Sequence, residues 1–309
     1  MNYRLLDLMA TGGLQTPDGV DSRVMDFIRS ALVSAVAVNA DSVARFYYEG
    51  GAPQNFDFRA DLPNFVPAFK SLWIDVDTSK ENEYVGGSGN TTPESRGALL
   101  YANVILKPDE WRADVTRWAG QLQGDLAEVI AAWESQEIRW TYEVFLFVLR
   151  KNVPLGPVAC LSMAITKDGV VPLTVAGKPA MICRVYSKKQ ADGSADTEPQ
   201  IQHYAAEATD LLKPILLSAG LLNSMDIRFT ETRRARSVSR KLVKTGSPIA
   251  DKPYYELGMD DVFHIVRAGA ASRGEHNVEA LRCHAEGLRN HKNSGTYDQP
   301  GAYWWEQHF

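Results

Sequence analysis

The fold is decided by two apolar stretches, Trp140-Thr-Tyr-Glu-Val-Phe-Leu-Phe-Val-Leu149 and Val158-Ala-Cys-Leu-Ser-Met-Ala-Ile165. Both are rich in aromatic and β-branched residues, which favour β-strands. Between them lies Pro154-Leu-Gly-Pro157, a combination typical of turns, and the turn dipeptide Asp168-Gly169 follows the second stretch. The pattern predicts two neighbouring antiparallel strands.

Two earlier stretches extend this sheet. Ser71-Leu-Trp-Ile-Asp-Val-Asp77 alternates apolar and polar residues at period two, which is the spacing of a half-buried strand. Residues Ala98–Leu106 show the same alternation less strictly, so the two stretches can pair. We expect an antiparallel sheet that contains Ala98–Leu106, Thr141–Leu149, Val158–Ile165 and Met181–Tyr186.

Three segments have the apolar spacing of amphipathic helices. Asp21 is a favourable N-cap for a first helix that begins at Ser22. Pro108 stands before a long periodic run over Asp109–Trp133, and a second long helix is expected over Gln202–Leu222. The sequence thus predicts an α+β protein whose antiparallel sheet is flanked by long helices.

Charge divides the chain of 309 residues into two parts. The formal net charge is −5, but Asp226–Phe309 holds 13 Lys+Arg against 11 Asp+Glu, so the rest of the chain is acidic. We therefore expect an acidic α+β body over residues 1–224 and a basic, histidine-rich subdomain over residues 225–309 that completes or caps the sheet. Since the acidic body repels polyanions, any contact with nucleic acid must be local.

Neither a membrane span nor a secretion signal is predicted. No apolar run reaches the roughly 18–20 residues that a membrane helix needs, and the first residues lack the pattern of a signal peptide. Cys160, Cys183 and Cys283 are odd in number and widely spaced, which indicates free thiols in a reducing compartment. We expect a cytoplasmic protein that does not associate with membranes.

The most basic segment is Arg228–Lys244, in which seven basic residues stand against the single acid Glu231. As a helix from about Thr232, it would place four cations on one face, namely Arg233, Arg236, Arg240 and Lys244. Guanidinium and ammonium groups bind phosphate oxygens, and the interleaved hydroxyls add donors. The ridge therefore predicts phosphate contact. Two alternatives stay open: a solvated face that forms ion pairs with the acidic body, and contact with a protein partner.

Histidine is concentrated at the end of the sequence, where five of the six histidines fall within the last 46 residues. The densest cluster contains Arg282, His284, Arg289 and His291. Two histidines can act as general base and general acid, and arginines stabilise the charge that develops on a phosphorane. This set predicts a metal-free nuclease. The alternative is a set of polar residues on an exposed hairpin.

No metal or cofactor is expected. The potential zinc ligands near the end of the sequence fit no established spacing: Cys283, His284, His291 and His308. Asp75 and Asp77, which end the strand predicted at 71–77, lack the third acid of a useful magnesium site.

A characteristic order of motifs spans Ile227–Phe309. It comprises Lys252-Pro-Tyr-Tyr255, His264-Ile-Val-Arg267, Leu281-Arg-Cys-His284 and Tyr303-Trp-Trp-Glu-Gln-His308. This order resembles a group of uncharacterised phage and prophage-associated proteins. The resemblance implies a phage or mobile-element origin, a location in the host cytoplasm and a C-terminal His/Arg-rich β-hairpin, but no particular reaction. Cys283 stands where the group usually has Gly, and residues 277–291 favour a helix by propensity, so helix and hairpin both stay open.

Three functions follow as hypotheses. The first is the binding of RNA or another single-stranded nucleic acid through Arg233, Arg236, Arg240, Lys244, Arg282 and Arg289. Trp304 would then stack on bases, unless it packs in a core strand. The second is cleavage of nucleic acid by His284 and His291. The third is an interaction module that binds a host protein, with the acidic body as a mimic of nucleic acid.

Overall fold

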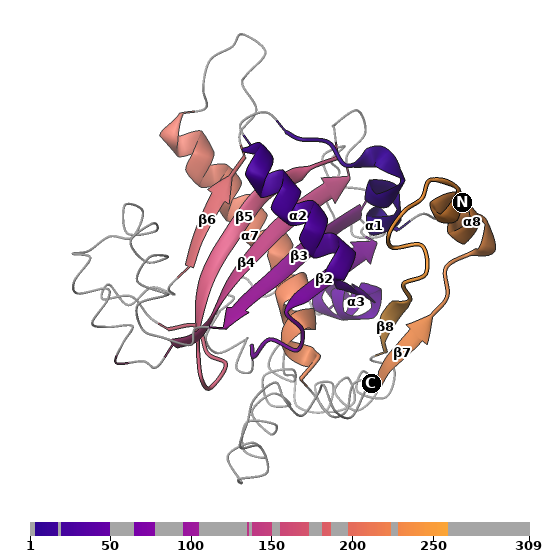
Figure 1. The fold of residues 1–309 in the computed structure, drawn as a ribbon. Coiled ribbons are helices and arrows are strands. Elements are labelled where there is room, and N and C mark those ends of the chain that lie inside the picture. Colours follow the sequence, from indigo (N-terminus) through magenta and orange to yellow (C-terminus); the bar gives the residue numbers. More distant parts are fainter. Residues whose placement is uncertain are drawn as a thin grey trace.

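A computed structural model describes ten parts of the chain: residues 4–17, 20–49, 65–77, 95–104, 135, 138–149, 155–172, 181–186, 197–223 and 228–258. They form one mixed sheet of eight strands with helices on both of its faces (Figure 1). The α+β class predicted from the sequence is confirmed at this level. The long helix expected over Asp109–Trp133 and the C-terminal hairpin lie outside the described residues.

The strand order across the sheet is β6-β5-β4-β3-β2-β1-β8-β7. The strands are β1 (Val36–Asn39), β2 (Ser71–Asp77), β3 (Ser95–Val104), β4 (Ile138–Leu149), β5 (Pro157–Thr166), β6 (Met181–Val185), β7 (Arg228–Thr232) and β8 (Tyr254–Gly258). Neighbours from β2 to β6 are antiparallel, as are β7 and β8. The antiparallel strands predicted near residues 98, 141, 158 and 181 are therefore present in sequential order.

The expectation of a purely antiparallel sheet is wrong at β1. This strand runs parallel to both of its neighbours, with Val38 opposite Ile74 of β2 and Tyr255 of β8. β1 has only four residues and follows a helix directly, so its apolar side chains look like the end of that helix in the sequence. The next helix, α3 (Asp41–Glu49), reverses the chain after β1, and parallel strands need such a crossover connection.

The other helices are α1 (Leu5–Leu8), which continues into the π-helical turn η1 (Met9–Gly13), α2 (Ser22–Ser34), α7 (Glu198–Leu221) and α8 (Arg236–Lys244). Asp21 caps α2 as predicted, since its Oδ1 accepts a hydrogen bond of 2.8 Å from the amide of Arg23. α7 begins four residues earlier than expected, because Thr197 and Gln200 form a capping box at its start. No helix within the described ranges has both the length and the hydropathy that crossing a bilayer requires.

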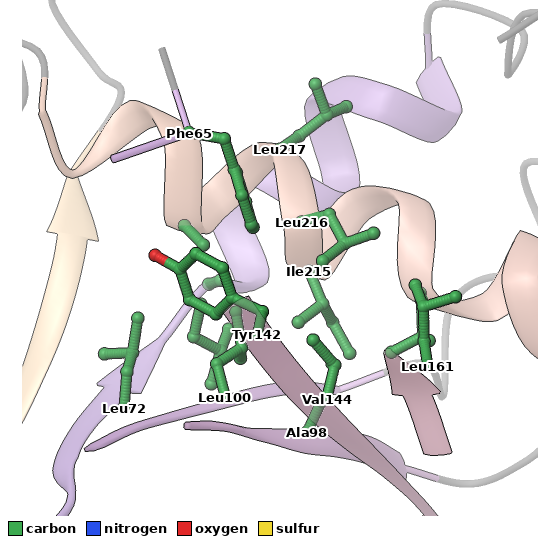
Figure 2. Packing of buried hydrophobic residues seen from close by; sticks show 14 of the residues in the cluster. Phe65, Leu72, Ala98, Leu100, Tyr142, Val144, Leu161, Ile215, Leu216 and Leu217 are labelled. Carbon is green, nitrogen blue, oxygen red and sulfur yellow. The ribbon is translucent and has the colours of Figure 1, made fainter. Parts of the chain in front are cut away.

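One face of the sheet is covered by α3 and α7, and the larger hydrophobic core lies between these layers (Figure 2). Ile215 and Leu216 of α7 lie over Leu100 of β3 and Val144 of β4, and all four side chains are fully buried. The ring of Tyr142 also points toward α7, and its centroid lies 4.9 Å from that of Phe65. Even-numbered residues of β3 face this core.

The opposite face is covered by α1 and α2, and a second core lies there, to which α8 contributes Val238 and Leu242. Met25 and Ile28 of α2 are fully buried, as are Trp73 and Leu99 on the strands beneath. The ring centroids of Trp73 and Phe147 are 5.5 Å apart. Because side chains alternate along a strand, the odd-numbered residues of β2 and β3 belong to this core. The sheet is thus buried on both sides over β2, β3 and β4.

Two of the three cysteines lie in this sheet. Cys160 of β5 is buried and Cys183 of β6 is half-buried, and both are free thiols. Burial raises the pKa of the Cys160 thiol to about 12, so this group is protonated at neutral pH. Cys283 lies outside the described residues.

Gly97 of β3 lies directly against Trp73 of β2. A Cβ atom at this position would lie 2.5 Å from Cζ2 of Trp73 and 3.1 Å from the carbonyl oxygen of Ile74. The indole is fully buried, so it cannot move aside. We predict that Gly97→Ala lowers the free energy of unfolding by about 1–3 kcal/mol, as overpacked cores do. Urea denaturation measures this change.

The matched control is Gly220→Ala in α7. A Cβ there would meet Cδ2 of Phe65 at 3.8 Å, an ordinary contact, and alanine favours a helix over glycine. This variant should be as stable as the unchanged protein or more stable. Equal unfolding midpoints for Gly97→Ala and the unchanged protein would show that Gly97 does not pack against Trp73 as described.

Candidate nucleic-acid interface

The basic segment that the sequence singles out lies at one edge of the sheet. β7 and β8 form an antiparallel pair, β8 pairs with β1, and α8 lies in the connection between β7 and β8 (Figure 1). Residues 228–258 therefore add two strands to the sheet of the preceding body. The boundary that we place between residues 224 and 225 stays a prediction, because this pairing does not show whether the two parts fold separately.

The helix begins later than the predicted start at Thr232. Residues Arg228–Thr232 form β7 instead, where Thr232 pairs with Tyr254. Their backbone groups therefore pair with β8 and do not form the first turn of a helix. α8 starts at Arg236. Arg233 is thus exposed on the segment before the helix and is not part of the helix.

α8 has one apolar and one basic side. Val238 and Leu242 are buried in the core beneath α1 and α2. Arg236, Arg240 and Lys244 are exposed and follow one another at four-residue steps, which places them along one face. The predicted grouping of these three cations is therefore present. We call them, together with the exposed Arg233, the basic face.

Arg234 departs from this pattern because it turns into the protein. Its side chain is 5% exposed, and Nε donates to Oδ1 of Asp7 in α1 at 2.7 Å. Nη1 donates to the carbonyl oxygen of Lys252, and the guanidinium carbon lies 4.7 Å from the ring centroid of Tyr254. Arg233 and Arg234 lie between the end of β7 and the start of α8, and their side chains differ in burial: Arg233 is exposed and Arg234 is turned inward.

Asp75 of β2 lies in a buried polar cluster beside this ion pair. Its Oδ2 accepts hydrogen bonds from Nε1 of Trp73 and from the hydroxyl of Tyr254, each 3.2 Å long. Nη1 of Arg4 lies 3.7 Å from Oδ1 of Asp75 and 2.9 Å from Oδ2 of Asp41 in α3. The cluster therefore connects the start of α1 with β2, β8 and α3.

Burial makes Asp75 and Asp7 harder to ionise. Burial raises the pKa of Asp75 to about 7, and the nearby charge of Arg4 and the two hydrogen bonds only partly oppose it. Burial also raises the pKa of Asp7, although the hydrogen bond and charge of Arg234 lower it. Asp75 is 1% exposed, so it is closed to solvent and does not offer a free carboxylate to a metal ion. No group of three or more His, Cys, Asp and Glu side chains with metal-binding geometry is found in the described residues.

The remaining predicted site residues lie outside the described ranges: Arg282, His284, Arg289, His291 and Trp304. Their convergence on one site stays a prediction. His203 of α7 is the single histidine in the described part of the chain, and its exposed ring lies 6.0 Å from that of Tyr204.

Comparison with protein-family models matches no family. Searches of curated proteins and of solved structures likewise find no match. The resemblance of the C-terminal region to phage-associated proteins therefore stays an expectation.

We predict that Arg234→Met lowers the free energy of unfolding by about 3–5 kcal/mol, because it leaves the buried Asp7 without its cation. Arg233→Met is the matched control: it removes the same charge one residue earlier, from an exposed position, and should change stability by no more than about 0.5 kcal/mol. Chemical denaturation of both variants measures the difference. If the two midpoints agree, the Asp7–Arg234 pair is not buried as described.

A second prediction follows from the raised pKa of Asp75. The folded protein holds a proton on Asp75 that the unfolded chain releases, so the contribution of Asp75 to stability falls as pH rises from about 3.8 to about 7. Asp75→Asn removes this titration and keeps an acceptor for Trp73 and Tyr254. The difference in free energy of unfolding between the unchanged protein and Asp75→Asn should therefore decrease over this pH range. Urea titrations at several pH values test it, and a difference that is constant or rises with pH contradicts it.

Proposed function

We propose that this protein binds RNA or another single-stranded nucleic acid through the basic face, Arg233, Arg236, Arg240 and Lys244. The observation that carries the proposal is the exposed row of Arg236, Arg240 and Lys244 on a helix whose opposite side is buried. Arg236 and Lys244 are eight positions apart on the helix, so the row is about 12 Å long. A row of this length can contact successive phosphates of one strand.

Among the described residues, ion pairing does not account for these cations. Within the described residues, no ion pair joins Arg236, Arg240 or Lys244 to a carboxylate. Their charge is thus available to an external anion. This favours phosphate contact over the alternative in which the face is neutralised by the acidic body.

The amino-terminal end of α8 also favours a bound anion. Arg236 occupies the first turn, where the partial positive charge of the helix dipole disfavours a cation. The first turn contains no acidic residue, and no side chain caps its amide groups. A bound phosphate would interact favourably with the guanidinium and with the helix terminus together.

The basic face is held in place before any ligand arrives. Val238 and Leu242 pack in the core, and Arg234 anchors the preceding segment to Asp7. A surface that is already ordered loses less conformational entropy on binding. The nuclease hypothesis rests on residues outside the described ranges, and no contact within them favours either it or the host-protein hypothesis, so both stay predictions.

We predict that the triple variant Arg236→Ala, Arg240→Ala, Lys244→Ala binds a fluorescent single-stranded RNA much more weakly at low salt. Three lost phosphate contacts should also reduce the slope of log K against log salt concentration by about 2. Fluorescence anisotropy at a series of salt concentrations measures both quantities.

The matched control removes three exposed arginines from α2 and α3: Arg23→Ala, Arg29→Ala and Arg45→Ala. It changes net charge by the same amount but should leave the affinity and the salt slope near those of the unchanged protein. An equal loss in both triple variants would show that binding follows net charge alone. No salt-dependent binding by the unchanged protein would reject the proposal altogether.

A further inference from the structure

A pocket of about 640 Å³ lies at the amino-terminal ends of the three parallel strands, apart from the basic face. It is bounded by the C-terminal half of α2, by the first residues of β1 and β2, by β3 and by residues 252–255. Its volume is within the range of about 300–1,000 Å³ that is usual for small-molecule sites. Nothing in the proposed function of α8 requires this pocket.

Aromatic side chains form much of its wall. They are Phe27 of α2, Phe69 before β2, Tyr101 of β3 and Tyr255 of β8, and all four are half-buried. Phe27 and Tyr101 pack on the face of the sheet that α2 covers, whereas Phe69 and Tyr255 pack on the face that α7 covers. Phe27 and Tyr101 are fixed against each other in an edge-to-face arrangement, with centroids 4.8 Å apart and planes at 79°. Partly exposed rings of this kind are suited to contact with a planar aromatic ligand.

The charge of the pocket is positive. Lys70 and Lys252 line it, and none of the described residues that line it is Asp or Glu. Nζ of Lys70 lies 5.7 Å from the ring centroid of Tyr101, so one cation is next to an aromatic ring. Nζ of Lys252 donates to the carbonyl oxygen of Val33 at the end of α2. An ammonium group has three donors, which leaves others for a ligand.

The sheet sets the spacing of the two lysines. Lys70 immediately precedes β2 and Lys252 comes two residues before β8, and β1 runs between these strands. Two strand spacings correspond to about 10 Å, a gap that two long lysine side chains can close around one phosphate group. Desolvation lowers the pKa of Lys252, and an anion bound beside it would offset this effect.

We propose that this pocket binds a nucleotide, with the base against Phe27 and Tyr101 and the phosphate between Lys70 and Lys252. The combination is specific, because the aromatic wall alone would accept any flat apolar molecule and the lysines alone would accept any anion. A base that carries a phosphate satisfies both. None of the four residues of the basic face lines this pocket, so the two sites use different side chains.

Isothermal titration calorimetry on the full chain tests the proposal with AMP, GMP, CMP and UMP, and with adenosine and inorganic phosphate as the separated parts. At least one nucleotide should bind. Adenosine and phosphate should each bind at least about tenfold more weakly than that nucleotide. Lys70→Ala should weaken nucleotide binding about tenfold, and because Lys70 is exposed this variant should fold normally. Phe27→Leu should also weaken it.

Arg23→Ala is the control, since it removes an exposed cation from the same helix as Phe27. It should leave nucleotide binding unchanged. The proposal is overturned if no nucleotide binds at about 1 mM, if Lys70→Ala binds as well as the unchanged protein, or if adenosine or phosphate alone binds as well as the nucleotide. The α8 triple variant should keep nucleotide binding while it loses RNA binding, so failure of one proposal is distinguishable from failure of the other.

Discussion

The ion pair between Asp7 and Arg234 joins the first helix of the chain to the segment before α8, and both side chains are almost entirely removed from water. Taking two charges out of water costs several kcal/mol for each ion, so the pair persists only where the geometry is good and other groups assist it. The carbonyl of Lys252 and the ring of Tyr254 provide this assistance. Since these groups come from opposite ends of the described chain, the pair can form only when α1, β8 and the start of α8 are all in place.

The polar cluster around Asp75 extends this arrangement across the end of the parallel strands. In open sheets with parallel strands, ligands commonly bind outside the carboxyl ends of the strands. Here the carboxyl ends of β1 and β2 meet Arg4, Asp41 and Asp75, which interact with one another. The amino ends of the same strands are bordered by the pocket with Lys70 and Lys252. The interior charges thus hold elements together, while Arg236, Arg240 and Lys244 on α8 are exposed.

Much of the fold could be predicted from local patterns. The period-two alternation at 71–77 and the β-branched residues at 141–149 and 158–165 correctly indicated strands, and Asp21 correctly indicated the start of α2. β1 was missed because a four-residue strand with only three apolar residues, directly after a helix, shows no period of its own. Its parallel pairing with β8 depends on contact between residues more than 200 positions apart, which no local pattern reveals.

The candidate site shows the same limit. The four-residue spacing of Arg236, Arg240 and Lys244 was visible in the sequence, because helical spacing is local. The inward turn of Arg234 was not, since adjacent arginines look alike in the sequence and the partner of Arg234, Asp7, lies at the other end of the described chain. The lysines of the pocket lie 182 positions apart in the numbering and are brought together only by the sheet.

The central claim is that the Asp7–Arg234 pair holds the basic face on the sheet. Hydrogen–deuterium exchange of the unchanged protein and of Arg234→Met tests it most directly, because exchange reports local opening segment by segment. The account predicts faster exchange in the variant at residues 5–8, 236–244 and 254–258 together, with α7 much less affected. Unchanged exchange over α8 in the variant would show that the basic face is held by other contacts.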